Sequence, residues 1–187
     1  KSAIEMNPLD SNAYYYLGNL WYDKRQYDEA IDCWERSARI NDSFPTVHRN
    51  LALAYYNKCK DPVRSLASME IATRLDPSDA RVLMELDQLY KTLNRPVAER
   101  LSILEGNIEI VKNRDDLYLE LITLYTLSGN FSIANELINA RKFHPWEGGE
   151  GKVSGQYIIT CVELAKKALA AQRYHDAIRL LKEAEIY

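Results

Sequence analysis

The segment from Phe143 to Lys152 holds residue types that could do chemistry. His144, Glu147 and Glu150 could ligate a metal ion or act as an acid and a base. In a second interpretation, Trp146 packs into an apolar groove and the neighbouring glycines let the chain reverse before the next helix. Neither a nucleophile nor a second ligand cluster accompanies these side chains, so we favour packing.

The remaining histidines and the cysteines lack the spacing of a catalytic or metal site. His48 falls at a core position, and His175 is expected in a turn between helices. Cys33, Cys59 and Cys161 are far apart and odd in number, which suits reduced thiols better than a disulfide framework. We therefore predict no catalytic residue, no cofactor and no metal, so the chain is not expected to be an enzyme.

The composition favours a folded helical protein. The chain has 187 residues, of which 47% are hydrophobic and 27% charged, with only 7 glycines and 6 prolines. The formal charge of −3 argues against a nucleic-acid surface or a polybasic membrane surface. Since no apolar run reaches the ~18 residues of a membrane span and no signal peptide is visible, we expect a cytoplasmic protein that binds neither nucleic acid nor membrane.

A leucine followed by a small residue and then an aromatic one recurs along the chain. The first copy has Leu17, Gly18 and Trp21, and a second apolar stripe with Ala30 and Trp34 follows it. Each stripe has helical spacing, so every copy predicts a pair of helices. The leucines are 34, 35, 35 and 43 residues apart: Leu17, Leu51, Leu86, Leu121 and Leu164.

This period and pattern resemble the tetratricopeptide repeat, whose copies of about 34 residues each form two helices. The resemblance covers the whole chain and implies an all-α fold, a right-handed α-solenoid in which each hairpin stacks on the next. It divides the chain as a single solenoid into the end of a preceding repeat (1–10), repeat 1 (11–44), repeat 2 (45–79), repeat 3 (80–114), repeat 4 (115–142), an inserted Gly-rich loop (143–153) and a truncated repeat 5 (154–187).

The third repeat departs from the pattern. Asp87 stands at the small-residue position of its first helix, Glu99 replaces the alanine of its second, and Gly106 falls inside that second helix. We expect looser packing there. In the second repeat, the turn from Asn57 to Pro62 is one residue longer than in the others.

Both ends of the sequence fall inside expected helices, because Lys1 and Tyr187 lie within second helices of their repeats. We expect further repeats or another domain to cover these ends, or self-association through them. The segment around Trp146 also resembles the repeat-bearing tails of long bacterial proteins whose preceding domains look carbohydrate-related. An alternative is therefore an accessory or oligomerisation region of a larger bacterial enzyme.

The resemblance implies a function as a non-catalytic scaffold. In this family the first helix of each pair lines a concave groove that holds a peptide or a segment of a partner protein. Glu120 is expected to face solvent. The residues carried over to the groove are Asn12, Tyr15, Asn19, Tyr22, Arg49, Asn50, Leu53, Tyr56, Arg81 and Gln88.

Chaperone-binding members of the family clamp a C-terminal carboxylate with two asparagines and several cations. Asn19 and Asn50 match the asparagines, and Arg81 is an acceptable cation. Tyr15 and Glu85 stand where two of the basic residues belong, and Glu85 would repel a carboxylate. We therefore do not predict this clamp.

Overall fold

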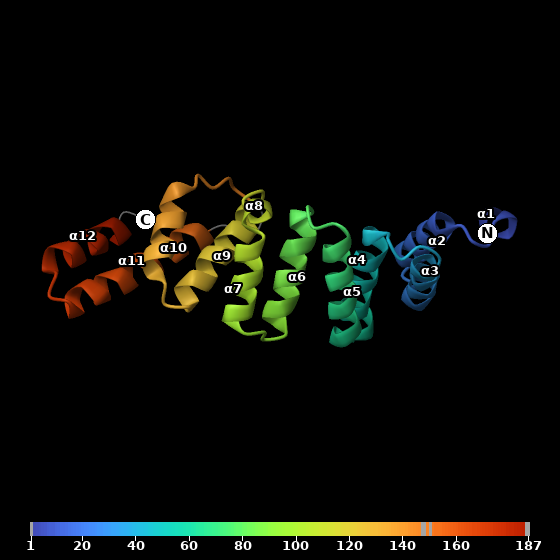
Figure 1. The fold of residues 1–187 in the computed structure, drawn as a ribbon, viewed down its shortest axis with the longest axis horizontal. Helices are drawn as coiled ribbons and strands as arrows, with labels where there is room; N and C mark the ends of the chain where they lie inside the picture. Colours follow the sequence, from blue (N-terminus) through green and yellow to red (C-terminus); the bar gives the residue numbers. More distant parts are fainter. Residues whose placement is uncertain (1, 147–148, 150, 186–187) are drawn as a thin grey trace. The chain divides into compact units, whose positions relative to one another are not determined.

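The computed structural model describes residues 2–146, 149 and 151–185, and within these it contains helices and no strand (Figure 1). The predictions made for Lys1, Glu147, Glu150 and Tyr187 lie outside the described residues. Because the described residues form helices and no strand, the all-α fold is confirmed. The chain divides into two compact units, residues 1–94 (unit 1) and 95–187 (unit 2).

Unit 1 contains two helical hairpins and the first helix of a third. Aspartates begin three of its helices: carboxylate oxygens of Asp10, Asp61 and Asp79 accept hydrogen bonds from main-chain N–H groups of the first turn that follows. The elements are α1 (Ser2–Met6), α2 (Ser11–Asp23), α3 (Tyr27–Ile40), α4 (Pro45–Ala54), the π-helical turn η1 (Tyr55–Cys59), α5 (Pro62–Leu75) and α6 (Ala80–Thr92).

Small residues lie where the two helices of each hairpin cross. A Cβ atom added to Gly18 of α2 would lie 2.5 Å from Cδ1 and Nε1 of Trp34 in α3. In the next hairpin, the Ser65 hydroxyl of α5 donates a hydrogen bond of 2.8 Å to the carbonyl oxygen of Ala52 in α4. The predicted small-residue positions therefore bring the backbones of paired helices close together.

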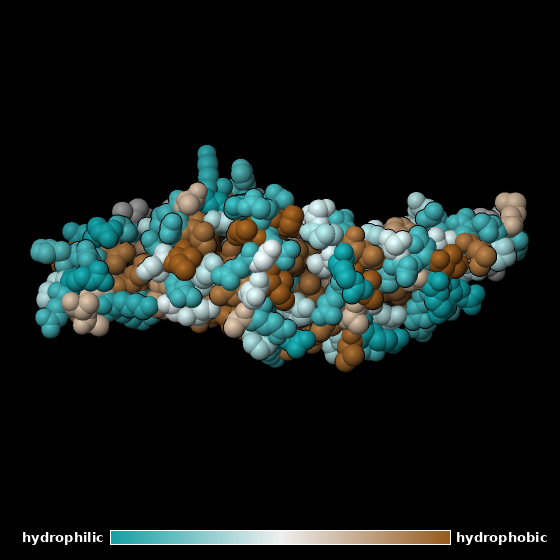
Figure 2. All heavy atoms as spheres, viewed as in Figure 1, coloured by the Kyte–Doolittle hydropathy of each residue, from teal (hydrophilic) through white to brown (hydrophobic). Residues whose placement is uncertain are grey.

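Consecutive hairpins of unit 1 share one apolar core. Ala30, Ile31 and Trp34 of α3 pack with Val47 and Leu51 of α4, and all five are buried. Hydrophobic stabilisation therefore depends on the neighbouring hairpin, as in other repeat proteins. On the face drawn in Figure 2, hydrophobic residues reach the surface in patches separated by hydrophilic ones.

The extra residue of the second repeat is absorbed as the π-helical turn η1. The Asp61 N–H donates to the Tyr55 carbonyl, six residues earlier, whereas in the first hairpin the Gln26 N–H reaches back five residues to Trp21. The longer loop predicted here is therefore a widened end of the helix.

Unit 2 begins with the segment expected to form the second helix of repeat 3 and contains two hairpins, α9 with α10 and α11 with α12. The predicted second helix of repeat 3 is interrupted: Gly106 ends α7, and Asn107, with φ −119° and ψ 30°, separates it from α8. The Asn107 side-chain amide donates 2.8 Å to the Ile103 carbonyl, which covers an acceptor that the break leaves open. The elements are α7 (Val97–Gly106), α8 (Ile108–Val111), α9 (Asp115–Leu127), α10 (Phe131–Ala140), α11 (Lys152–Ala170) and α12 (Tyr174–Glu185).

The buried small-residue position of α7 is held by Arg100, and not by Glu99 as the sequence suggested. The Arg100 N–H bonds the carbonyl at the helix start, as the Ala30 N–H does in α3, and Arg100 is 4% exposed. Its guanidinium donates 2.7 Å to Oε1 of Glu120 in α9. Glu120, expected at the solvent face, has a side chain only 12% exposed.

The turn between the two helices of each repeat contains one residue in the left-handed conformation. These residues are Arg25 (φ 61°), Lys60 (55°), Asn94 (54°), Gly129 (77°) and Gln172 (58°). A left-handed residue after the last helical turn satisfies the terminal carbonyl groups. Only one of the five is glycine, so four turns retain the strain of a side chain with positive φ.

We expect Gln172→Gly to stabilise unit 2 by about 0.5–1 kcal/mol, because the left-handed strain exceeds the entropy cost of the glycine. Gly129→Ala should destabilise it by about 1 kcal/mol, although an added Cβ would meet nothing within 4 Å. The midpoint of urea unfolding, followed by circular dichroism, measures both changes. The two variants should change the free energy of unfolding in opposite directions. A change in the same direction for both would contradict the explanation from backbone conformation.

Candidate functional site

Four predicted groove residues meet in a pocket between α2 and α4. This polar pocket has a volume of about 380 Å³. Two asparagines, one on each helix, and the Trp34 indole form its polar wall. Its lining residues are Asn19, Tyr22, Asp23, Trp34, Asn50 and Leu53.

A hydrogen-bond network fixes the two asparagines of the polar pocket. Trp34 Nε1 donates 3.1 Å to Oδ1 of Asn19 and lies 3.3 Å from the Tyr15 carbonyl oxygen, while Asn50 Nδ2 lies 3.4 Å from the same Asn19 Oδ1. Within the described part of the chain, Nδ2 of Asn19 and Oδ1 of Asn50 have no hydrogen-bond partner. The pair therefore presents one donor and one acceptor, the two groups that a peptide main chain requires.

A second pocket of about 220 Å³ lies one hairpin further along, among α4, η1, α5 and α6. Its wall is almost entirely apolar, with two methionines. This apolar pocket shares Leu53 with the polar pocket. Its lining residues are Ala52, Leu53, Tyr56, Ser65, Met69, Met84, Glu85, Gln88, Leu89 and Thr92.

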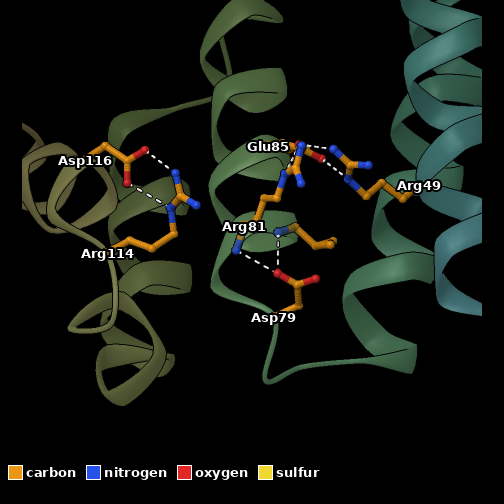
Figure 3. Close-up of polar contacts among 7 residues, drawn as sticks. Arg49, Asp79, Arg81, Glu85, Arg114 and Asp116 are labelled. Atoms are coloured by element: carbon orange, nitrogen blue, oxygen red, sulfur yellow. Dashed lines mark hydrogen bonds and ion pairs between the residues drawn. The ribbon is translucent and has the colours of Figure 1, made fainter. Parts of the chain in front are cut away.

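The two predicted groove cations share one carboxylate. Arg49 of α4 forms a bidentate pair with Glu85 of α6, with Nε to Oε2 at 2.7 Å and Nη2 to Oε1 at 2.5 Å. Arg81 Nε lies 3.4 Å from Glu85 Oε1, so Glu85 lies between the two guanidinium groups (Figure 3). The hydrogen bond to Glu85 raises the pKa of Arg49. The carboxylate that was expected to repel an anion is thus neutralised by these arginines.

The other two predicted groove residues lie outside both pockets. Asn12 is exposed in the first turn of α2. Tyr15 is half-buried, and its ring lies 4.9 Å from that of Phe44 and 5.1 Å from that of Tyr16, measured between centroids. Tyr15 therefore contributes packing as well as a partly accessible surface.

The histidines and cysteines lie largely where they were predicted. His48 is buried, with Nε2 3.0 Å from the Asp42 carbonyl oxygen. Cys33 and Cys161 are buried free thiols, and burial raises the pKa of each. His175 is the exception, because it lies within α12 and not in a turn.

In unit 2, Asp115 at the start of α9 binds the segment that follows α10 through an ion pair and hydrogen bonds. Arg141 forms an ion pair with Asp115 and donates to the Lys112 carbonyl, while the His144 N–H donates 2.8 Å to Asp115 Oδ2. Burial opposes ionisation of Asp115, but hydrogen bonds from His144 and Arg141 outweigh it and lower its pKa. A separate pair joins Arg114, the residue before α9, to Asp116 in the first turn of that helix (Figure 3).

The packing role predicted for Trp146 is confirmed. Its ring is half-buried and lies 6.4 Å from that of Phe143, between centroids. Gly149 lies against the indole so closely that a Cβ would clash with it, and Gly151 reverses the chain with φ 71°. The next helix begins at Lys152, two residues before the expected repeat boundary.

The described residues bear on two other functions, metal binding and membrane insertion. They contain no group of three or more His, Cys, Asp or Glu side chains placed to hold a metal ion. None of their helices combines the length and the apolar character needed to cross a membrane.

Comparisons with known proteins agree with this architecture. The family model of the TPR (tetratricopeptide) repeat matches residues 18–58, which span the second half of α2, all of α3 and α4, and most of η1. YrrB, described as a TPR protein with an unusual peptide-binding site, superposes with a TM-score of 0.66 at 16% identity, covering 98% of this chain and 89% of that one. PilF of Pseudomonas aeruginosa gives 0.63 at 15% identity, covering 99% and 80%.

A smaller structure matches part of the chain. The first TPR of Spaghetti (RPAP3), solved with the HSP90 peptide SRMEEVD, has a TM-score of 0.52 and 21% identity, covering 64% of this chain and 93% of that one. At these identities the structural matches establish the fold, the predicted α-solenoid of stacked hairpins. The repeat model over residues 18–58 and these structural matches show that the chain has the fold of tetratricopeptide-repeat proteins.

Proposed function

We propose that the chain is a non-catalytic scaffold that binds an extended segment of a partner protein along α2, α4 and α6 of unit 1. The observation that carries this proposal is the asparagine pair, because Asn19 and Asn50 offer a donor and an acceptor beside two adjoining pockets. YrrB and the RPAP3 repeat are described with a peptide-binding site or a bound peptide, which supports the same use of this fold.

The ligand segment is internal and not a C-terminal carboxylate. A carboxylate clamp needs cations whose charge is available to the ligand, but Arg49 and Arg81 are both occupied by Glu85. Displacing Glu85 would leave its charge unpaired in a half-buried position, which is costly. A partner whose main chain bonds the asparagine pair avoids this cost.

We expect Asn50→Ala to weaken binding of a partner isolated by cross-linking and pull-down by about tenfold, because the hydrogen bond to Asn50 Oδ1 is lost and Asn19 loses one of the groups that hold it. Isothermal titration calorimetry with the recombinant partner measures the change. Asn113→Ala is the matched control, because Asn113 is exposed in unit 2 between α8 and α9. Unchanged affinity for Asn50→Ala, with normal helicity, would place the binding surface elsewhere.

A further inference from the structure

The polar and apolar pockets occupy equivalent places in consecutive hairpins. Every residue of the polar pocket has a counterpart 34 or 35 residues later, and all but one of these counterparts line the apolar pocket. The equivalences are Asn19 with Leu53, Tyr22 with Tyr56, Trp34 with Met69, Asn50 with Glu85, Leu53 with Gln88, and Asp23 with Asn57, the last lying outside the apolar pocket. The two pockets are therefore one repeated site with different side chains.

Two of these exchanges change the chemistry of the site. Trp34 fills the first site with an indole whose N–H is bonded to Asn19. Met69 replaces that indole with a thinner, apolar side chain that is 2% exposed, and Leu53 replaces the asparagine. The second site therefore lacks the indole N–H and the asparagine amide of the first, and its wall is almost entirely apolar.

The volume of the apolar pocket limits what it can hold. At about 220 Å³ it lies below the ~300–1,000 Å³ range of pockets for whole small molecules, so a single side chain suits it better. Met69 and Met84 line it, and methionine adapts its shape to irregular apolar groups. The turn η1, which carries Tyr56, widens the backbone at the same place.

The charged groups at the rim favour an uncharged ligand. Glu85 is paired with Arg49 and Arg81, and Asp79, which also acts on Arg49, caps the first turn of α6. The two cations and two anions of this cluster sum to zero. A charged side chain entering the pocket would lose its hydration without gaining a partner of opposite charge.

From these observations we propose that the apolar pocket receives one large aliphatic side chain, leucine or methionine, from an uncharged, extended stretch of the partner. This proposal rests on the proposed function and specifies its ligand. The main chain of the stretch bonds Asn19 and Asn50, and the side chain that follows enters beside Leu53.

The test uses the whole protein with its methionine methyl groups labelled with carbon-13. The chain has three methionines, so the spectrum reports the pocket through Met69 and Met84 and carries its own control in Met6, which is 83% exposed on α1. The probes are N-acetyl-leucinamide and N-acetyl-methioninamide, with N-acetyl-glutaminamide as the polar comparison. We expect saturable shifts of Met69 and Met84 with the aliphatic probes, no shift of Met6, and about tenfold weaker binding of the glutamine probe.

Leu53→Asn should weaken binding of the aliphatic probes about tenfold, since it puts an amide of similar size into the apolar wall. Leu20→Asn, on the 57% exposed Leu20 of α2, is the matched control and should change nothing. Equal shifts at all three methionines, the absence of any shift, or tighter binding of N-acetyl-leucine with a free carboxylate would each overturn the proposal. Loss of partner binding in Asn50→Ala but not in Leu53→Asn would retain the scaffold function and reject this pocket.

Discussion

Gly18→Leu should unfold the first hairpin, at a cost of about 3 kcal/mol or more. Even the first added atom, Cβ, would lie 2.5 Å from the Trp34 indole and 3.1 Å from the Ala30 carbonyl oxygen. The indole cannot move freely, because it is buried and Nε1 is bonded to Asn19. Overpacking of this kind costs about 1–3 kcal/mol for a few extra methylene groups, and leucine adds four carbons against backbone.

Hydrogen exchange distinguishes local from global unfolding for this variant. Amide protection should be lost in α2 and α3 and kept in unit 2, because stability in a repeat protein is carried mainly by neighbouring hairpins. Gly106→Ala is the matched control: its added Cβ meets nothing within 4 Å, so it should stabilise α7 by up to about 1 kcal/mol. Wild-type protection of α2 in Gly18→Leu would show that the close crossing is not required.

The helices and their pairing could be predicted from the sequence because the signals are local and repeated. The leucine of each copy returns five times with helical spacing to the residues around it, and the first two copies have the complete order of leucine, small residue and aromatic residue within two helical turns. Aspartate caps such as Asp10 and Asp79 are also read from adjacent residues. The left-handed turns were harder to find, since Arg25 and Gln172 do not have the residue type that usually marks positive φ.

Features that depend on distant residues could not be predicted. Glu85 was judged as an isolated negative charge, and only the fold brings Arg49, 36 residues earlier, into contact with it. The sequence alignment of the third repeat was wrong by one residue, so that Glu99 was assigned to the buried position of α7 that Arg100 occupies. This repeat has no small residue at that position to guide the alignment. The π-helical turn was visible only as an extra residue between Asn57 and Pro62.

The sequence indicated which residues of the first helices share a surface, but it did not indicate two kinds of pocket. The register of the first helices placed Asn19, Asn50 and Leu53 on one surface, and the polar pocket brings them together. The apolar pocket also needs Met69, which comes from the second helix of the pair. Its apolar wall follows from the replacement of an indole N–H by a thioether, a difference in chemistry that the hydrophobic pattern does not record.

Glu120→Ala should destabilise unit 2 by about 3–5 kcal/mol, because it removes the carboxylate from a guanidinium that is almost fully buried. The Arg100 and Glu120 side chains are 4% and 12% exposed, and they meet at 2.7 Å between α7 and α9. Removing the carboxylate of a buried ion pair takes away charge compensation that water cannot fully replace, which costs more than the loss of an exposed ion pair.

This loss is measured by urea unfolding of unit 2, with hydrogen exchange in α7 and α9 as the local readout. Glu183→Ala provides the matched control. Glu183 pairs with Arg179 at the same distance of 2.7 Å, but their side chains are 35% and 62% exposed, so its loss should cost no more than about 0.5 kcal/mol. Glu120→Gln should fall between the two, since the amide keeps an acceptor for Arg100 but not the charge. Equal effects for Glu120→Ala and Glu183→Ala would show that burial does not make the Arg100–Glu120 pair more important to stability than an exposed pair.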